Sequence, residues 1–135
     1  MTELNKPEIL EIPRVEDPRG NLSFIQNDAP CCPFTIRRVY WIYDVPGGRL
    51  RHGHAFRRAK ELIVALSGAF DVVVTFPDGT SETHRLSRSY YGLYVPEGSW
   101  RQLENFSTNS VAMVLSSTLY DPDDYIENFE EYVNS

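Results

Sequence analysis

Two of the three histidines in this 135-residue chain lie close together and are followed by a glutamate: His52, His54 and then Glu61. A histidine side chain ordinarily titrates near neutral pH, so it can take a proton from a substrate and return it. Histidine and glutamate are also common ligands of transition metals. Residues two apart on a β-strand project to the same face. The spacing therefore predicts that His52 and His54 share one strand face and carry either proton transfer or a metal.

The wider spacing resembles the two sequence motifs of the cupins. The first motif reads G-x5-H-x-H-x4-E-x6-G, and the chain matches it with Gly48, His54, Glu61 and Gly68. The second motif is matched in part by Pro96-Glu97-Gly98, Arg101 and Asn105. Cupins are jelly-roll barrels in which strand faces enclose a ligand cavity, and the resemblance implies that fold. The alternative is an unrelated β-sandwich with an accidental match.

Two residues argue against a metal site at this motif. Phe56 stands where the second histidine of the first motif would be and cannot bind a metal, and Arg101 stands where a histidine is usual and would repel a cation. His54 and Glu61 alone supply too few ligands, because a transition metal needs about three or four from the protein. We therefore expect a barrel without metal or other cofactor.

Short apolar runs separated by turn residues predict the strands that position these residues, in an all-β jelly roll that forms a single domain over residues 1–135. The predicted strands are Asn21–Gln26, Ile36–Tyr43, Glu61–Leu66, Phe70–Phe76, Thr83–Leu86, Gly92–Val95, Arg101–Phe106 and Val111–Ser117. Pro77-Asp78-Gly79-Thr80 predicts a hairpin turn. At the C-terminus, Asp121 is a good N-cap ahead of Pro122, and Ile126, Phe129 and Val133 fall on one helical stripe. These residues predict a short C-terminal α-helix that packs outside the barrel.

Charge and cysteine content limit the partners. The net charge is −6 and no block of Lys or Arg occurs, so nucleic acid and anionic membranes are not expected to bind. A phosphate-bearing ligand must then be held by a few placed arginines. Cys31 and Cys32 are adjacent and cannot form a disulfide framework, and no apolar stretch is long enough for a membrane span. These observations predict a cytoplasmic protein.

With the motif located, most of the chain resembles the dTDP-4-keto-6-deoxyglucose 3,4-ketoisomerases. The resemblance runs from about Ile12 to Tyr132 and is carried by Asp17-Pro18-Arg19-Gly20-Asn21-Leu22, Arg37-Arg38-Val39-Tyr40-Trp41, Arg51 to Ala55, Gly92-Leu93-Tyr94-Val95-Pro96 and Tyr120-Asp121-Pro122-Asp123-Asp124-Tyr125. It implies a metal-free cytoplasmic homodimer, with N-terminal strands often exchanged between subunits, that acts in deoxysugar biosynthesis for polysaccharides or antibiotics. It further implies that Arg19 and Arg51 approach a pyrophosphate, and that Tyr40 and a histidine pair line the sugar pocket.

Roles follow for the site residues. Moving a ketone from C4 to C3 requires a group that removes the C3 proton and delivers one to C4, and we assign this to His54. Tyr40 or a second histidine would stabilise the developing enolate oxygen, and His52 could replace the histidine lost at Phe56. Each assignment has a structural alternative: a buried structural histidine, an exposed histidine at the barrel mouth, or a core tyrosine.

The remaining polar residues of the motif have weaker assignments. Glu61 would orient His54 or Arg101, and Arg101 would hold a substrate oxygen. Arg19 and Arg51 could form paired hydrogen bonds to phosphate oxygens or only surface salt bridges. His84 is expected at the surface without a role.

The sequence thus predicts a metal-independent isomerase that moves the keto group of a dTDP-4-keto-6-deoxyhexose from C4 to C3 through an enediol. Two alternatives remain. One is a non-catalytic nucleotide-sugar-binding cupin that lost its second catalytic histidine at Phe56. The other is an epimerase acting on a related dTDP-sugar.

Overall fold

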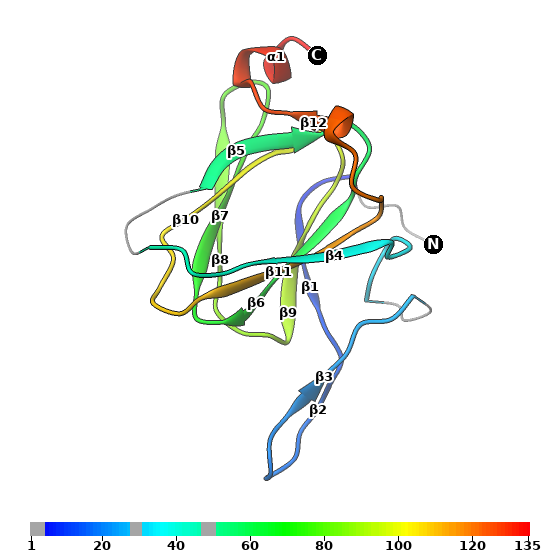
Figure 1. The fold of residues 1–135 in the computed structure, drawn as a ribbon, viewed down its shortest axis with the longest axis vertical. Helices are drawn as coiled ribbons and strands as arrows, with labels where there is room; N and C mark the ends of the chain where they lie inside the picture. The colour runs from blue at the N-terminus through cyan, green and yellow to red at the C-terminus, as the bar shows by residue number, and fades with distance from the viewer. Residues whose placement is uncertain (1–4, 28–30, 47–50) are drawn as a thin grey trace.

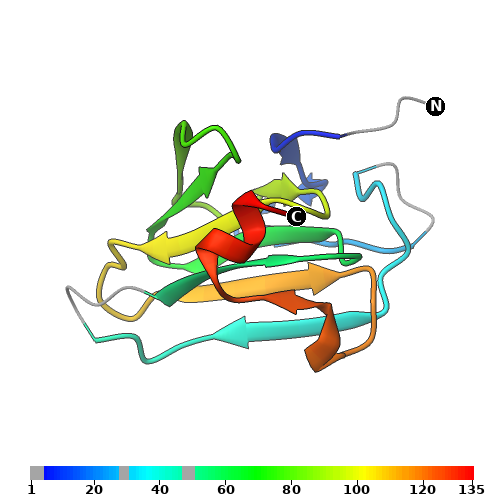
Figure 2. The ribbon, with the colours of Figure 1, turned by 90° about the horizontal axis from the view of Figure 1, so that it is seen from above.

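Two five-stranded antiparallel sheets face each other in a β-sandwich (Figure 1 and Figure 2). The structure, a computed structural model, describes residues 5–27, 31–46 and 51–135, and for Arg51 and His52 the backbone alone. The strand orders are β1-β9-β6-β11-β4 and β12-β5-β10-β7-β8, and β2 and β3 form a separate hairpin. The predicted all-β class with a short C-terminal helix is confirmed.

The elements have the following bounds: β1 Glu8–Glu11, β2 Arg14–Val15, β3 Leu22–Ser23, β4 Arg38–Ile42, β5 Arg51–Phe56, β6 Glu61–Ser67, β7 Phe70–Thr75, β8 Ser81–Leu86, β9 Tyr91–Val95, β10 Trp100–Glu104, β11 Val111–Ser116, a 3-10 turn at Pro122–Asp124, β12 Tyr125–Ile126 and α1 Phe129–Val133. The predicted strands from Ile36 onward all occur, with ends shifted by one or two residues. The predicted strand over residues 21–26 is shorter and covers only Leu22–Ser23. The sequence did not single out β1, β2 or β12, which are short, whereas β5 contains the segment in which His52 and His54 were predicted to share a strand face.

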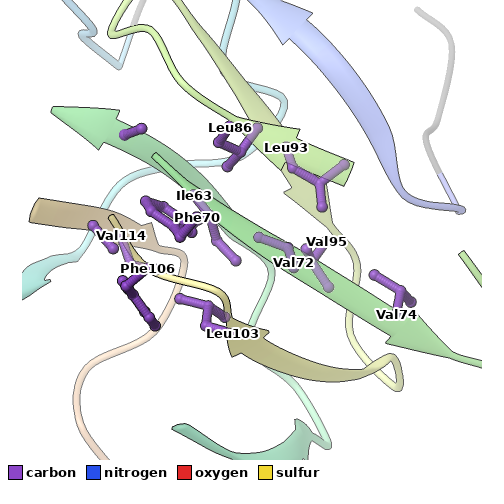
Figure 3. Close-up of a cluster of buried hydrophobic side chains, with 12 residues drawn as sticks. Ile63, Phe70, Val72, Val74, Leu86, Leu93, Val95, Leu103, Phe106 and Val114 are labelled. Carbon is purple, nitrogen blue, oxygen red and sulfur yellow. The ribbon is translucent and has the colours of Figure 1, made fainter. Parts of the chain in front are cut away.

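The main core fills the space between the two sheets, where alternate residues of each strand meet (Figure 3). Phe70, Val72 and Val74 from β7 are fully buried there, opposite Ile63 of β6 and Val114 of β11. Strand β6 is also covered on its outer face, because Leu62 and Val64 lie in a second buried cluster. This central strand of the first sheet is therefore apolar on both faces.

The predicted turn at Pro77–Thr80 is confirmed. It joins β7 to β8, Gly79 has a φ of +91°, and the Thr80 amide donates to Asp78 Oδ1 at 2.9 Å. A backbone position with positive φ strongly favours glycine, which explains why residue 79 is a glycine.

The predicted C-terminal helix begins later than its cap suggested. Asp121 does cap a turn, since its Oδ1 accepts the Asp123 amide at 3.0 Å, but this turn is a 3-10 turn of three residues. The buried Asp124 carboxylate accepts the amides of Arg58 and Ala59, which fixes the segment beside β5. Ile126 therefore lies in β12 and not on the helical stripe. The helix α1 starts at Phe129, is capped by Asn128, and buries Tyr132.

The β2–β3 hairpin extends away from the sandwich, at the end opposite to α1 (Figure 1). It exposes apolar side chains, among them Val15 and Leu22, which are 54% and 57% exposed. Within the described residues, no helix is long and apolar enough to cross a membrane.

Candidate active site

A cavity of about 590 Å³ lies between the two sheets next to the main core. Strands β4, β6 and β11 line one side of it, β5 and β10 line the other, and the segment that contains Tyr120, Tyr125 and Glu127 completes the wall. Strands β4, β6 and β10 each contribute two residues to the cavity wall. The first is polar, and the second, two positions later, is apolar and also packs in or against the main core. These pairs are Tyr40 and Ile42, Glu61 and Ile63, and Arg101 and Leu103. The period of two along each strand thus joins the site to the core.

The floor of the cavity holds a buried ion pair. Arg101 Nη1 donates to Glu61 Oε1 at 2.7 Å, and the two residues are 1% and 0% exposed. The Tyr40 hydroxyl donates to both Glu61 oxygens, at 2.9 and 3.0 Å. A second guanidinium, Arg38 Nη2, lies 3.7 Å from Glu61 Oε2. A buried carboxylate needs such partners to offset its lost hydration. Two guanidiniums against one carboxylate leave this cluster with an excess positive charge.

The Tyr40 hydroxyl remains protonated at the cavity floor. Burial is the main cause that raises the pKa of this phenol, and the negative charge of Glu61 adds to the rise. A phenol that donates to a carboxylate has its one proton in use. Tyr40 therefore holds Glu61 in place, and its donation to a substrate enolate stays a prediction.

His54 lies on the cavity wall in β5, directly opposite Arg101 of β10 in the strand pairing. Its ring contacts two aromatic rings: Phe56 edge-on at a centroid distance of 4.9 Å, and Tyr125 at 5.5 Å. The side chain is half-buried. This position, beside a cavity rather than inside the core, suits a group that exchanges protons with a ligand.

Phe56, the residue that replaces a cupin histidine, is fully buried beside His54. The Arg101 guanidinium lies over its ring at 5.0 Å. Among the described residues, the buried Arg101 Nη2 has no hydrogen-bond partner. A cation over an aromatic face is stabilised by the ring quadrupole. The Phe56 ring therefore partly compensates Arg101 for the hydrogen-bond acceptor that its Nη2 group lacks.

The wall around β5 depends on a glycine. A Cβ atom at Gly53 would collide with the indole of Trp100, which lies across β5 in a cluster with Ala55, Ile126 and Tyr132. This cluster places α1 and β12 against the outer face of β5. The C-terminal segment is thereby held at the edge of the cavity.

The structure brings together four of the seven predicted site residues: Tyr40, His54, Glu61 and Arg101. Arg19 lies elsewhere. It follows β2 in the protruding hairpin, its side chain is 89% exposed, and Nη2 is paired with Asp17 Oδ2 at 2.9 Å. The side chains of Arg51 and His52 lie outside the described residues, as does Gly48.

Sequence reasoning did not assign a role to Arg38, Tyr120 or Tyr125. Arg38 precedes Tyr40 by two residues, so the strand period could have placed it on the same face. No such signal exists for Tyr125, because its position depends on the pairing of β12 with the distant β5. Among the described residues, no group of three or more His, Cys, Asp or Glu side chains is placed to hold a metal ion.

Three comparisons relate this chain to known proteins. The family described as "FdtA: WxcM-like, C-terminal" matches residues 5–135. The TDP-4-oxo-6-deoxy-α-D-glucose-3,4-oxoisomerase of Aneurinibacillus thermoaerophilus is 34% identical over 128 residues, which are 93% of this chain and 91% of that protein. The chain belongs to the FdtA family. The resemblance to the sugar 3,4-ketoisomerases is confirmed.

Solved structures of sugar 3,4-ketoisomerases have the same fold. The WlaRB TDP-quinovose 3,4-ketoisomerase of Campylobacter jejuni has a TM-score of 0.90 at 31% identity, covering 98% of this chain and 100% of that one. QdtA, a sugar 3,4-ketoisomerase of Thermoanaerobacterium thermosaccharolyticum solved with TDP, has a TM-score of 0.91 at 28% identity, covering 98% and 95%. These two structures extend the likeness over nearly the whole chain.

Proposed function

We propose that this FdtA-family chain is a nucleotide-sugar 3,4-ketoisomerase that converts a dTDP-4-keto-6-deoxyhexose into the corresponding 3-keto sugar. The observation that carries this proposal is the position of His54 on the wall of a cavity that also holds the buried Arg101–Glu61 ion pair. Family membership and the names of the relatives support the same reaction. The cytoplasmic location stays a prediction.

The chemistry follows from these two features. His54 takes the proton from C3, which the neighbouring C4 carbonyl makes acidic, and the electron pair forms the C3–C4 double bond of an enediol. His54 then returns a proton to C4, the C3 hydroxyl becomes the ketone, and the proton of that hydroxyl passes to the C4 oxygen. Negative charge develops on the C4 oxygen in this sequence, and the Arg38 and Arg101 guanidiniums favour it electrostatically. His52 remains a proposed second proton carrier.

Nucleotide recognition is proposed to depend on Arg19 and Arg51. QdtA, a sugar 3,4-ketoisomerase of the same fold, was solved in complex with TDP. Guanidinium groups match the oxygen geometry of a pyrophosphate better than a lysine does. In a single chain Arg19 lies between the paired strands β2 and β3, in the hairpin that protrudes in Figure 1, and does not line the cavity, so we propose that it serves the site of a partner subunit.

Exposed apolar residues support a homodimer. Three apolar side chains share the outer face of β4 and of the residue that follows it: Val39, Trp41 and Tyr43, which are 46%, 59% and 62% exposed. Strand β4 lies at the edge of its sheet. We call these three residues the β4 surface. Such a contiguous apolar strip at a sheet edge typically marks a protein interface. Exchange of the N-terminal strands between subunits would also cover the apolar hairpin.

We expect Trp41→Glu to shift the protein from dimer to monomer, because the variant places a charge in the centre of the β4 surface. Light scattering after size-exclusion chromatography measures the mass. Val133→Glu, on α1 and outside the β4 surface, is the matched control and should leave the dimer intact. A dimeric Trp41→Glu protein would place the interface on another surface.

Incubation with dTDP-4-keto-6-deoxyglucose in D2O, followed by NMR, tests the proposed function. The 3-keto product should form, with exchange at C3 and C4 of the sugar and none at C5. An epimerase would exchange at C3 and C5.

The substitution at Phe56 favours a second function, a non-catalytic binding module. That protein would bind dTDP without any exchange, and Phe56→His would then gain activity. Wild-type turnover in the NMR experiment excludes this second function.

A further inference from the structure

Tyr125 lies where a second proton-carrying group is needed. It is the first residue of β12 and pairs with Phe56 of β5 in the strand register. Its ring is 4.6 Å from the Phe56 ring and 5.5 Å from the His54 ring, and it lines the cavity. Phe56 itself, at the position of the missing histidine, has no proton to give. Tyr125 thus presents a phenol beside His54, on the strand next to the substituted position.

Other hydroxyl groups of the described cavity wall are less suited. The proton of Tyr40 is donated to Glu61. Tyr120 is 67% exposed, and its ring lies 6.1 Å from that of Tyr125. Of these three tyrosines, Tyr125 is the one whose ring contacts His54.

One neighbouring charge favours proton transfer from Tyr125. Burial is the main cause that raises the pKa of Tyr125; the nearby Arg38 guanidinium opposes the rise, and the Glu61 carboxylate adds to it. A guanidinium has donors and no acceptor, so the phenol cannot give its proton to Arg38. Arg38 therefore favours a transient phenolate while leaving the proton available to a ligand.

We propose that the Tyr125 hydroxyl carries the proton between the two oxygens of the enediol, in place of the histidine that Phe56 replaces. This inference rests on the proposed ketoisomerase function. As His54 removes the C3 proton, Tyr125 gives its proton to the C4 oxygen. As His54 returns a proton to C4, the phenolate takes the proton of the C3 hydroxyl. Both groups end in their starting states, and no oxidant or reductant is needed.

Tyr125→Phe tests this role, because it keeps the ring against Phe56 and His54 and removes only the oxygen. We expect kcat to fall about 100-fold, the usual size of a lost acid–base group, with KM changed less than about threefold. The melting temperature should stay within a few degrees of wild type. Tyr90→Phe, which removes a phenol oxygen that does not line this cavity, is the matched control and should keep wild-type kcat.

The outcomes separate this inference from the proposed function. An active wild type with an equally active Tyr125→Phe variant would leave the ketoisomerase function in place and reduce Tyr125 to a wall residue. An equal loss in the Tyr90→Phe control would also overturn the assignment. A wild type without turnover would instead remove the proposed function itself. A selective fall in kcat for Tyr125→Phe supports the proton carrier.

Discussion

His54→Asn is expected to lower the turnover of the 4-keto sugar by about 10²–10⁴-fold, the usual contribution of a general acid–base group. Asparagine keeps a polar side chain of similar reach on the cavity wall but cannot take a proton at neutral pH. Both carbon proton transfers in the proposed reaction pass through this ring. NMR in D2O should show the same decrease for exchange at C3 and for formation of the 3-keto product.

His84→Asn is the control for that experiment. His84 lies on β8, where its Nε2 is 2.9 Å from Glu82 Oε1, and it does not line the cavity. Its loss should leave turnover unchanged. If His54→Asn retained more than about a tenth of wild-type activity, the base would have to be another group, and His52 would be the first to examine.

Glu61→Leu is expected to lower the free energy of unfolding by about 3–5 kcal/mol, because it leaves Arg101 buried without its carboxylate. Arg101 is 1% exposed and therefore cannot regain its hydration by a small movement. Denaturant unfolding at one fixed protein concentration measures the loss, since a dimer's stability depends on concentration.

The double variant Glu61→Leu/Arg101→Met separates the pair from its surroundings. Replacing both members of a buried ion pair by apolar residues is often nearly neutral. We therefore expect the double variant to be more stable than Glu61→Leu alone, by about 2 kcal/mol or more, in a double-mutant cycle. Additive losses in the two single variants would show that the 2.7 Å contact contributes little coupling.

The strands of this protein can be predicted from its sequence more readily than the contacts between segments that are distant in sequence. Strands such as β7 could be predicted because Phe70, Val72 and Val74 alternate with polar or half-exposed residues. The C-terminal segment could not, because Asp121 gives the same capping signal for a 3-10 turn as for an α-helix. Its course is decided by the hydrogen bonds of Asp124 to the amides of Arg58 and Ala59, which no local pattern shows.

The site shows the same division. His54, Glu61 and Arg101 could be placed together from motif spacing, because the spacing fixes which strand faces they occupy. The tie between Tyr40 and Glu61 was not foreseen, and neither was the contact of Tyr125 with His54, since both join strands that are distant in sequence. Arg19 was predicted to approach a pyrophosphate; in a single chain it does not line the cavity, and we propose that the contact occurs in a dimer.

The negative charge of Glu61, at the start of β6, also affects which register β6 adopts when it pairs with its neighbouring strands. Residues Leu62 to Ala65 are buried on both faces of the sheet, so a slip of one residue would exchange one apolar side chain for another at little hydrophobic cost. The same slip would turn Glu61 out of the cavity and bury Arg101 without a carboxylate. That penalty is several kcal/mol, far more than the difference between neighbouring aliphatic residues. The ion pair thus discriminates between correctly and wrongly registered barrels, so the charges proposed to favour the enediolate also select the native pairing of β6 during folding.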